Sequence, residues 1–338
     1  MERYSRQILF KPIGANGQKQ LTEQHVLIVG AGALGTGIAE SLARAGVGKM
    51  TIIDRDYVEW SNLQRQQLYG ESDAEHKIPK AVAAKTRLLE INSFIEIEAI
   101  VADATPDLLE PLMDGVSLLL DATDNFDIRF IINDLSQKYN IPWIYGACVG
   151  SYGISYTILP GETPCLQCLL KTVPLGGATC DTVGIISPAV QMVVAHQVAE
   201  ALKILTGNQN SLRKKLVSFD LWENRYSSID VNRMKDSSCL SCGDSPSFPY
   251  LSYENQTKTA VLCGRDSVQI RPNTKQTRNL EEMEVVFADQ GLKVDRNPFL
   301  LSVEIGNQRL VLFKDGRAIV HGTKDITEAK NIYYRYVG

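Results

Sequence analysis

The chain has 338 residues, 44% of them hydrophobic and 22% charged, a length that suits one large α/β domain and a smaller one. Its 35 lysines and arginines against 39 acidic residues give a net charge of −4, so we expect no nucleic acid partner held by a global basic field. The charged N-terminus and the lack of an apolar run of about 18 residues argue against a signal peptide, a membrane span and a membrane partner. We therefore expect a cytoplasmic protein.

Apolar runs and helical patterns alternate over the first half of the chain. The run HVLIVG ends at a glycine and is followed by apolar residues at helical spacing, which is typical of a strand, a turn and a helix. Repetition of this pattern predicts a Rossmann-like, mainly parallel sheet with helices on both faces. The predicted strands lie at 25–30, 50–54, 95–101, 116–121 and 142–148, and the predicted helices at 34–45, 79–91 and 126–139.

A later helix is predicted to have Ser187 as its N-cap and to stop at Gly207. Turn-forming residues then become frequent, so we divide the chain into a large domain (1–245), a linker (246–257) and a small α+β domain of unknown role (258–338). The sequence leaves that role open among partner docking, dimerisation and stabilisation. In the small domain, strands are predicted near 260–269, 299–304 and 309–313, and helices near 279–290 and 327–336.

The motif GAGALG fits the pattern GxGxxG at Gly30, Gly32 and Gly35, between a predicted strand and a predicted helix. Glycines there let the backbone turn tightly, approach a ligand and bring helix and strand together, while the helix N-terminus favours phosphate. Asp54 ends the next strand, where its carboxylate would accept hydrogen bonds from ribose hydroxyls. The pattern predicts a nucleotide site; the alternative is a close-packed turn without a ligand.

Three donors follow the second predicted strand, namely Asn62 and Arg65 in SNLQRQQLYG and Lys80 further on. A nicotinamide enzyme has only a pyrophosphate to bind and needs no such additional donors. Together, these three residues would hold a triphosphate. Asp124 in DATDN follows the fourth strand and would hold Mg²⁺, which prefers one or two carboxylates plus phosphate oxygens. The alternatives are solvated surface groups for the donors and a turn or capping role for Asp124.

Two CxxC pairs, Cys165 with Cys168 and Cys239 with Cys242, have the spacing of a tetrahedral Zn²⁺ site. A closed shell of four thiolates is structural rather than catalytic, and a redox dithiol is the alternative. Cys180 lies in the glycine-bounded stretch GGATCDTVG, where it is either a nucleophile or sulfur acceptor or a passive thiol.

With these motifs in view, the chain resembles the ThiF/MoeB family, the bacterial branch of the enzymes that activate ubiquitin-like proteins. The likeness covers about residues 3–243. It rests on RYSRQ, GAGALG, TIIDRDYVEWSNLQRQ, IPKA, DATDN, GATC and the paired CxxC motifs. GxGxxG alone is weak, but the combination is specific.

The resemblance implies an ATP-dependent adenylyltransferase that activates the C-terminal glycine carboxylate of a ubiquitin-like sulfur-carrier protein, of the ThiS or MoaD type. The product would serve thiamin thiazole or molybdopterin synthesis, and a cysteine desulfurase would be a candidate sulfur donor. By this resemblance Gly30, Gly32 and Gly35 would line the ATP site and Asp54 would hold the ribose. The remaining implied contacts are Asn62, Arg65 and Lys80 to the phosphates and Asp124 to Mg²⁺.

The family also implies a homodimer in which Arg6, from RYSRQ, reaches into the site of the partner subunit as an arginine finger. Cys180 would lie on a loop where family members form covalent links to the carrier or to sulfur. The likeness does not extend to the rhodanese domain of eukaryotic relatives, because CGRDS at Cys263 lacks the glycine and arginine spacing of a rhodanese loop.

Three other functions are weighed against adenylation. A nicotinamide dehydrogenase fits the glycine motif and Asp54, but no histidine is placed for hydride chemistry. A tRNA-modifying dehydratase of the same superfamily would act on RNA, which the acidic balance disfavours. A zinc-bearing scaffold that binds nucleotide and a partner would need no catalytic Lys80.

Overall fold

We analysed a computed structural model of the chain, which describes residues 2–170, 183–252, 259–262, 266–271 and 277–337. The chain separates into two compact units. The first comprises Met1–Gly177 and Ile185–Asn255, and the second comprises Ala178–Gly184 and Gln256–Gly338.

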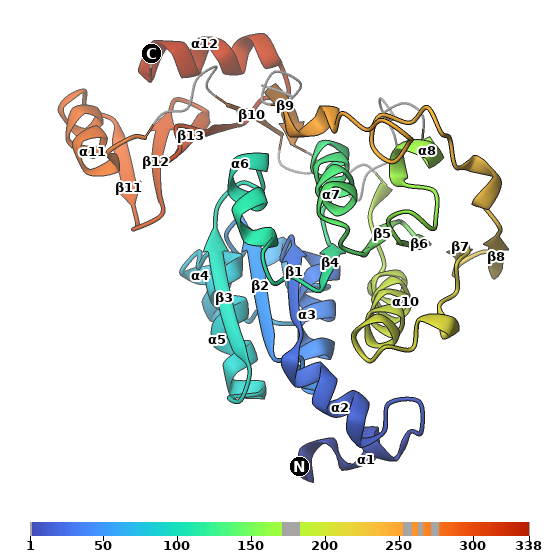
Figure 1. Cartoon of the computed structure of the whole chain (residues 1–338). Helices are drawn as coiled ribbons and strands as arrows, with labels where there is room; N and C mark the ends of the chain where they lie inside the picture. Colours follow the sequence, from blue (N-terminus) through green and yellow to red (C-terminus); the bar gives the residue numbers. More distant parts are fainter. Residues whose placement is uncertain (1, 171–182, 253–258, 263–265, 272–276, 338) are drawn as a thin grey trace. The chain divides into compact units, whose positions relative to one another are not determined.

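An eight-stranded sheet in the order β3-β2-β1-β4-β5-β6-β7-β8 organises the first unit (Figure 1). The strands from β3 to β5 are parallel, and β6, β7 and β8 continue the sheet in antiparallel fashion. The predicted mainly parallel sheet is therefore confirmed, and its antiparallel extension was not predicted. The strands are β1 (His25–Val29), β2 (Lys49–Asp54), β3 (Glu96–Val101), β4 (Leu118–Asp121), β5 (Trp143–Val149), β6 (Tyr152–Ile158), β7 (Leu216–Asp220) and β8 (Arg225–Ile229).

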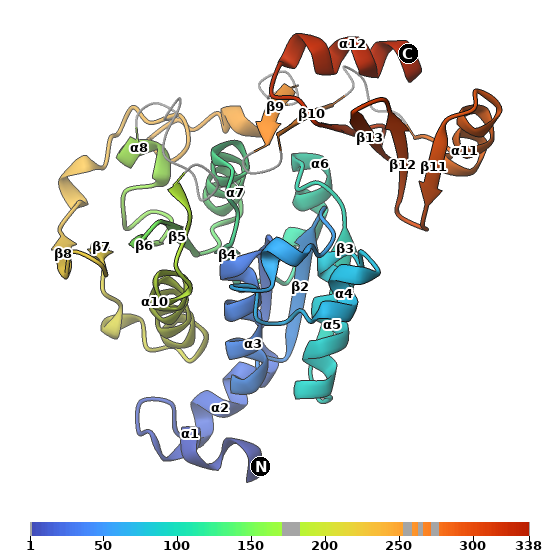
Figure 2. The same ribbon diagram turned by 180° about the vertical axis from the view of Figure 1, so that it is seen from behind.

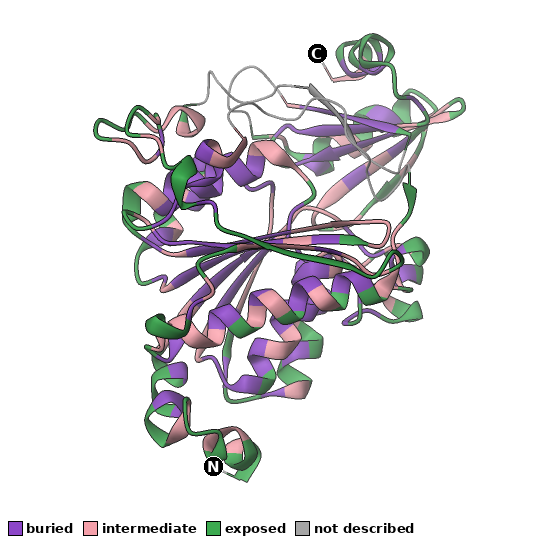
Figure 3. Cartoon of the chain, turned by 90° about the vertical axis from the view of Figure 1, so that its right-hand side faces the viewer, coloured by how far each residue is buried: buried purple, intermediate pink, exposed green. Residues whose placement is uncertain are grey.

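Helices cover both faces of this sheet, as predicted, because successive strand residues point to opposite sides. In β1, Val26 and Ile28 belong to one hydrophobic core, and Leu27 and Val29 to the other. Figure 3 shows the buried strands between the helices that cover them. The first core contains residues of α3 (Ala33–Ala45), α5 (Lys80–Ile91) and α10 (Ser187–Leu205), and the second contains residues of α6 (Pro106–Leu109) and α7 (Phe126–Tyr139).

Ser187 is not the N-cap of α10, contrary to the prediction. The helix begins at Ser187 itself, and Ile186 occupies the capping position without a side-chain hydrogen bond. The backbone N–H of Ile186 is instead bound to the carbonyl of Gly150 at 3.0 Å, so sheet contacts hold the chain in place of a polar cap. After the helix ends at Leu205, Gly207 adopts a positive φ of 72°, which fits its expected role as a stop.

The second unit is built on an antiparallel sheet in the order β11-β12-β13-β14-β10-β9, with α11 (Leu280–Asp289) and α12 (Ile326–Tyr336) packed on one face of it (Figure 2). The predicted single strand at 260–269 is two strands, and two further short strands were not predicted. The observed strands are β9 (Thr259–Leu262), β10 (Ser267–Ile270), β11 (Lys293–Arg296), β12 (Leu300–Ile305), β13 (Gln308–Phe313) and β14 (Ala318–His321).

Two short helices, α1 (Ser5–Leu9) and α2 (Gly14–Glu23), precede β1, and neither was predicted. Before the second unit, Tyr250 stacks on Phe130 of α7, with ring centroids 4.5 Å apart. Within the described part of the chain, no helix has both the length and the apolar composition needed to cross a bilayer.

Candidate active site and metal centre

Three strands bring the predicted nucleotide-binding residues to one edge of the parallel sheet. Val29, the last residue of β1, is in register with Ile53 of β2 on one side and with Asp121 of β4 on the other. The chain continues from β1 toward β2 and β3, and returns on the opposite side of β1 as β4 and β5. Open α/β sheets bind ligands beyond the carboxyl ends of the strands at such a reversal.

The glycine loop follows β1, and its three glycines have different local constraints. Gly30 has a φ of 99°, and a Cβ placed on it would lie 2.4 Å from the carbonyl oxygen of Ala122. A Cβ on Gly35 would lie 2.0 Å from the carbonyl oxygen of Gly30, so the helix packs directly on the loop. At Gly32, the N-cap of α3, a Cβ would meet no protein atom within 4 Å. Packing therefore explains Gly30 and Gly35, but it does not explain Gly32.

We expect Gly35→Ala to destabilise the protein, because the new methyl group cannot share space with the Gly30 carbonyl. Overpacking of this kind costs about 1 to 3 kcal/mol, and the short distance puts this case at the upper end of that range. Chemical denaturation of both proteins measures the loss. Gly70→Ser is a suitable solvent-exposed comparison, because Gly70 has a φ of −115° and open space for a side chain. Equal stability of the Gly35→Ala and wild-type proteins would contradict the packing described.

Asp54 ends β2 and binds the glycine loop. One carboxylate oxygen accepts the backbone N–H of Ala31 at 2.6 Å, and the other accepts that of Asp56 at 2.7 Å. Burial raises the pKa of Asp54, and the nearby charge of Lys80 acts in the opposite direction. Asp54 thus fixes the loop, and each of its oxygens keeps a second lone pair for a further donor.

Lys80, the first residue of α5, is brought to the same place. It is only 5% exposed, and its Nζ lies 3.5 Å from a carboxylate oxygen of Asp56. The hydroxyl of Tyr69 donates to the carbonyl of Ala31 at 2.7 Å and is 3.1 Å from the carbonyl of Lys80. The structure therefore brings the glycine loop, Asp54 and Lys80 together, as expected for residues that share a ligand.

Asn62 and Arg65 lie on the segment between β2 and α5. Asn62 is buried, and its Oδ1 accepts the backbone N–H of Glu59 at 3.1 Å, which caps the short helix Trp60–Asn62. Arg65 is partly exposed and donates from Nη1 to the carbonyl of Ser61 at 2.8 Å. Asn62 therefore has a structural role of its own, whatever it contributes to ligand binding.

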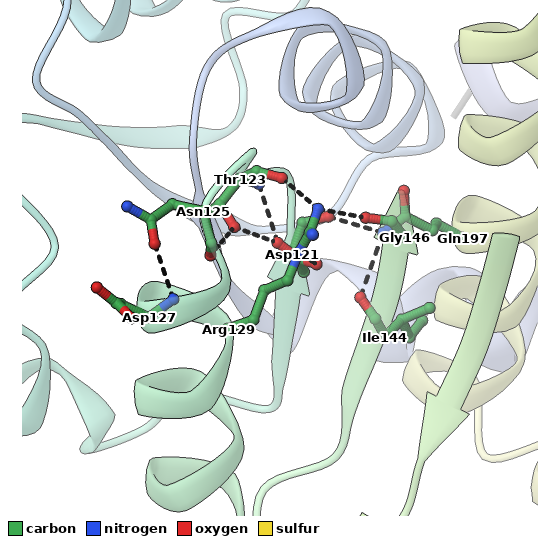
Figure 4. Close-up of polar contacts among 8 residues, drawn as sticks. All are labelled: Asp121, Thr123, Asn125, Asp127, Arg129, Ile144, Gly146 and Gln197. Carbon is green, nitrogen blue, oxygen red and sulfur yellow. Dashed lines mark hydrogen bonds and ion pairs between the residues drawn. The ribbon is translucent and has the colours of Figure 1, made fainter. Parts of the chain in front are cut away.

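Asp124 is exposed on the loop that leaves β4, and its neighbour Asn125 caps α7 by accepting the N–H of Asp127 at 2.7 Å (Figure 4). The capping role considered for Asp124 therefore belongs to Asn125. Asp121, the last residue of β4, is fully buried, and its Oδ1 accepts both the backbone N–H and the hydroxyl of Thr123. These hydrogen bonds fix the path of the loop that presents Asp124.

Arg129 completes this network from α7. Its Nε donates to Asp121 Oδ2 at 3.0 Å, and its Nη2 donates to the carbonyls of Thr123 at 2.6 Å and Gly146 at 3.4 Å (Figure 4). The guanidinium also lies over the rings of Phe126 and Tyr145. Burial raises the pKa of Asp121, but the charge of Arg129 and the hydrogen bonds from Thr123 oppose that rise.

Gln197 of α10 binds the backbone of both β4 and β5. Its Nε2 donates to the carbonyl of Asp121 at 2.8 Å and to that of Ile144 at 3.2 Å. The ladder between β4 and β5 covers only two residue pairs, and beyond it Arg129 and Gln197 supply the donors that a neighbouring strand would otherwise supply. Neither residue was predicted. The one available signal was an arginine that follows DATDN within the predicted helix.

Arg6 is exposed on α1 and lies far from this edge of the sheet within its own chain. Its neighbour Gln7 donates to the carbonyl of Ala45 at the C-terminal end of α3, whereas the glycine loop precedes the N-terminal end. The 13 residues of α3 separate these ends by about 20 Å. Within its own chain, Arg6 therefore does not lie beside the glycine loop. Cys180 lies outside the described residues.

The four predicted metal ligands meet in one cluster, which we describe as a first turn (Cys165–Cys168) and a second turn (Cys239–Cys242). Their four sulfur atoms all lie within 4.8 Å of one another. The sulfur atoms of Cys165 and Cys239 are 3.6 Å apart, and those of Cys168 and Cys242 are 3.4 Å apart. Zn²⁺ with bonds of about 2.3 Å to four sulfurs needs separations of about 3.8 Å, so the donor set fits this ion.

The thiols also affect one another's protonation. A hydrogen bond from Cys165 lowers the pKa of Cys242 to about 5, and the same interaction raises the pKa of Cys165. Burial raises the pKa of Cys168 to about 12. A divalent cation would bind all four as thiolates, which removes this competition for protons.

Fold and site together define a Rossmann-like α/β protein with a four-cysteine centre. The chain belongs to the ThiF family, whose model matches residues 4–241, which confirms the resemblance seen in the motifs. It is 53% identical to the sulfur carrier protein ThiS adenylyltransferase of Bacillus subtilis over 336 residues, 99% of each chain. The molybdopterin-synthase adenylyltransferase of Salmonella typhimurium is 34% identical, over 72% of this chain and 96% of its own.

Solved structures agree on the fold. The crystal structure of E. coli MccB with ATP superposes with a TM-score of 0.61 at 25% identity. The match covers 72% of this chain and 75% of that protein.

Proposed function

We propose that this protein is an adenylyltransferase that uses ATP to activate the C-terminal carboxylate of a ThiS-type sulfur carrier for thiamin biosynthesis. One observation carries this proposal: the ThiS adenylyltransferase of B. subtilis is 53% identical over 99% of both chains. The molybdopterin-synthase relative matches only 72% of this chain, which favours a ThiS-type over a MoaD-type carrier.

In the proposed reaction a carboxylate oxygen of the carrier bonds to the α-phosphorus of ATP, and the bond from that phosphorus to the oxygen bridging to the β-phosphate breaks. Pyrophosphate leaves with the electron pair, so no oxidant or reductant is needed. The carboxylate is already an anion at neutral pH, and no general base is required. The protein has to align two reactants and offset the negative charge that builds up on the phosphates.

The backbone amides at the start of α3 are proposed to face the phosphates, and Asp54 to accept the ribose hydroxyls. Gly32 would then be the residue at which the backbone comes closest to the phosphates, since no protein atom limits the size of its side chain. We propose that Lys80, Arg65 and Asn62 offset charge on the departing pyrophosphate. The support for Lys80 is its burial beside Asp54 and Asp56.

We expect Gly32→Ala to weaken ATP binding about tenfold or more while leaving the melting temperature close to that of the wild type, because the methyl group has no protein neighbour. Calorimetric titration with a non-hydrolysable ATP analogue measures the affinity, and thermal denaturation serves as the control. The Gly32 assignment fails if affinity is unchanged.

Mg²⁺ is proposed to bind at Asp124, an exposed carboxylate at the end of the network that Arg129 and Asp121 hold together. When bound, the ion would neutralise phosphate charge. Zn²⁺ is proposed for the cysteine cluster, where a complete shell of four sulfurs makes it structural.

A homodimer is proposed because Arg6 does not lie beside the glycine loop of its own subunit. Two variants that we expect to have low activity, Arg6→Ala and Lys80→Met, test this when they are mixed after partial unfolding. Activity recovered in the mixture requires dimers in which one subunit supplies Arg6 and the other supplies Lys80. If the protein is a monomer, or if each site is formed by one chain alone, the mixture would not recover activity.

Cys180 is proposed as the residue whose thiolate accepts the activated carrier, with AMP leaving, or accepts sulfane sulfur from the persulfide of a cysteine desulfurase, the candidate sulfur donor, with the donor thiolate leaving. Intact mass measurement after incubation with ATP and carrier tests this role. An adduct present in wild type and lost in Cys180→Ser supports the proposal, and adducts equal in both proteins oppose it.

The decisive experiment is exchange of labelled pyrophosphate into ATP with separate ThiS-type and MoaD-type carriers. We expect exchange only when a carrier ending in diglycine is present, and faster exchange with the ThiS type. A carrier lacking the terminal glycine is the control. Absence of exchange with both carriers would disprove the adenylation proposal, and preference for the MoaD type would move the enzyme to molybdopterin synthesis.

A further inference from the structure

The helix α7 contacts both cysteine-bearing turns through two adjacent side chains. Asn133 Oδ1 accepts the backbone N–H of Leu166, in the first turn, at 2.8 Å. The next residue, Asp134, accepts the hydroxyl of Ser241, in the second turn, through its Oδ1. One short stretch of helix therefore fixes two segments that lie more than 70 positions apart in the sequence.

These contacts are shielded from solvent. Asn133, Asp134 and Ser241 are each 0% exposed. The second oxygen of Asp134 accepts the backbone N–H of Tyr250 at 2.9 Å, so both carboxylate oxygens are occupied. The hydroxyl of Ser241 is also 2.6 Å from Oε1 of Gln167, which joins the second turn to the first. Buried polar groups held in this way resist displacement, because losing one partner leaves the other without a hydrogen bond.

We propose that Asn133 and Asp134 are positioning residues of the metal centre, which hold the two turns at ligand spacing and so determine how firmly a metal ion is retained. The four sulfur atoms come from two turns that are far apart in the sequence, so the local chain does not hold these turns beside each other. The hydrogen bonds from α7 supply that constraint. Residues that orient metal ligands typically change metal affinity 10- to 100-fold when they are replaced.

An alternative role for the same side chains is to stabilise the fold without affecting the metal. Such a role would lower the stability of the metal-loaded and the metal-depleted protein equally. A positioning role would lower the stability of the metal-loaded protein more, because the spacing of the ligands contributes to stability only when the metal is bound. The comparison of the two states therefore separates the alternatives.

The test uses one variant for each turn in the full-length protein. Asn133→Leu removes the acceptor for the first turn and keeps the number and branching of the side-chain heavy atoms. Ser241→Ala removes the hydroxyl that the second turn gives to α7. Ser238→Ala is the matched control, because this exposed hydroxyl lies in the same region but bonds to Asp236 and not to α7.

Two quantities are measured for each protein loaded with Zn²⁺: the rate of metal transfer to a chromogenic chelator, and the melting temperature before and after chelation. We expect Asn133→Leu and Ser241→Ala to release metal at least about tenfold faster than wild type. Ser238→Ala should release it at the wild-type rate. The melting temperature of both test variants should fall more in the loaded state than after chelation.

Release from Ser241→Ala at the same rate as from Ser238→Ala would overturn the proposal. Equal losses of melting temperature in the two states would also overturn it, since they would show a role in folding alone. If Asn133→Leu yields no folded protein, Ser241→Ala still decides the question, because deletion of one hydroxyl is a small change. Neither measurement depends on enzyme activity, so the result stands independently of the proposed function.

Discussion

Replacing Lys80 with methionine is expected to lower carrier-dependent pyrophosphate exchange roughly 100- to 1,000-fold, the range measured when one charge-stabilising donor is removed from a catalytic site. Methionine keeps most of the side-chain volume in this buried position but removes the charge. In the proposed reaction that charge is needed most as pyrophosphate departs. The turnover number should therefore fall more than the affinity for ATP.

The control for this experiment is Arg87→Ala on the same helix, since Arg87 is exposed and pairs with the exposed Glu90. Exchange should stay close to the wild-type rate in this control. If Lys80→Met lowers the affinity for ATP but leaves turnover unchanged, Lys80 contributes binding alone, and its proposed role at the departing pyrophosphate is wrong.

Replacing Arg129 with methionine is expected to destabilise the protein by about 3 to 5 kcal/mol, because it leaves the buried carboxylate of Asp121 without its partner. Two backbone carbonyls, those of Thr123 and Gly146, lose a donor in the same change. The loop that carries Asp124 is then no longer fixed, so the concentration of Mg²⁺ needed for half-maximal exchange should rise. Urea denaturation and a magnesium titration measure the two effects.

Asp121→Asn in the Arg129→Met background separates charge from hydrogen bonding. If an unpaired charge causes the loss, this second change should restore part of the stability, because asparagine keeps the shape of the side chain without its charge. No recovery would mean that the lost carbonyl contacts of Arg129 dominate. A wild-type magnesium requirement in Arg129→Met would show that Asp124 does not need this support.

Local sequence patterns were sufficient to predict the parallel core. Strands β1, β2 and β4 are mostly apolar and buried, β3 at the edge of the sheet alternates apolar and acidic residues, and a glycine or an acid marks the end of β1, β2 and β4. The glycine loop, Asp54 and Lys80 could be placed for the same reason, since each follows directly from a strand end or a helix start. The pairing of the two CxxC turns followed from the chemistry of a four-coordinate metal.

Other features depend on contacts that no short pattern encodes. Strand β8 is exposed along its whole length, so it lacks the apolar run that would reveal it. Arg129 and Gln197 become important only because α7 and α10 meet the gap between β4 and β5 from separate parts of the chain. Ser187 has the composition of an N-cap, yet the backbone of Ile186 is already tied to Gly150.

The spacing of two residues along α7 determines which contacts are lost when this helix unfolds locally. Arg129 binds the loop that follows β4, and Asn133 binds the first turn. These two residues are four positions apart and therefore lie one above the other on the same side of the helix. Fraying of this helix would release both attachments in a single event. We therefore expect the loop after β4 and the two cysteine-bearing turns to open together, and their backbone amides to exchange with heavy water at a common rate.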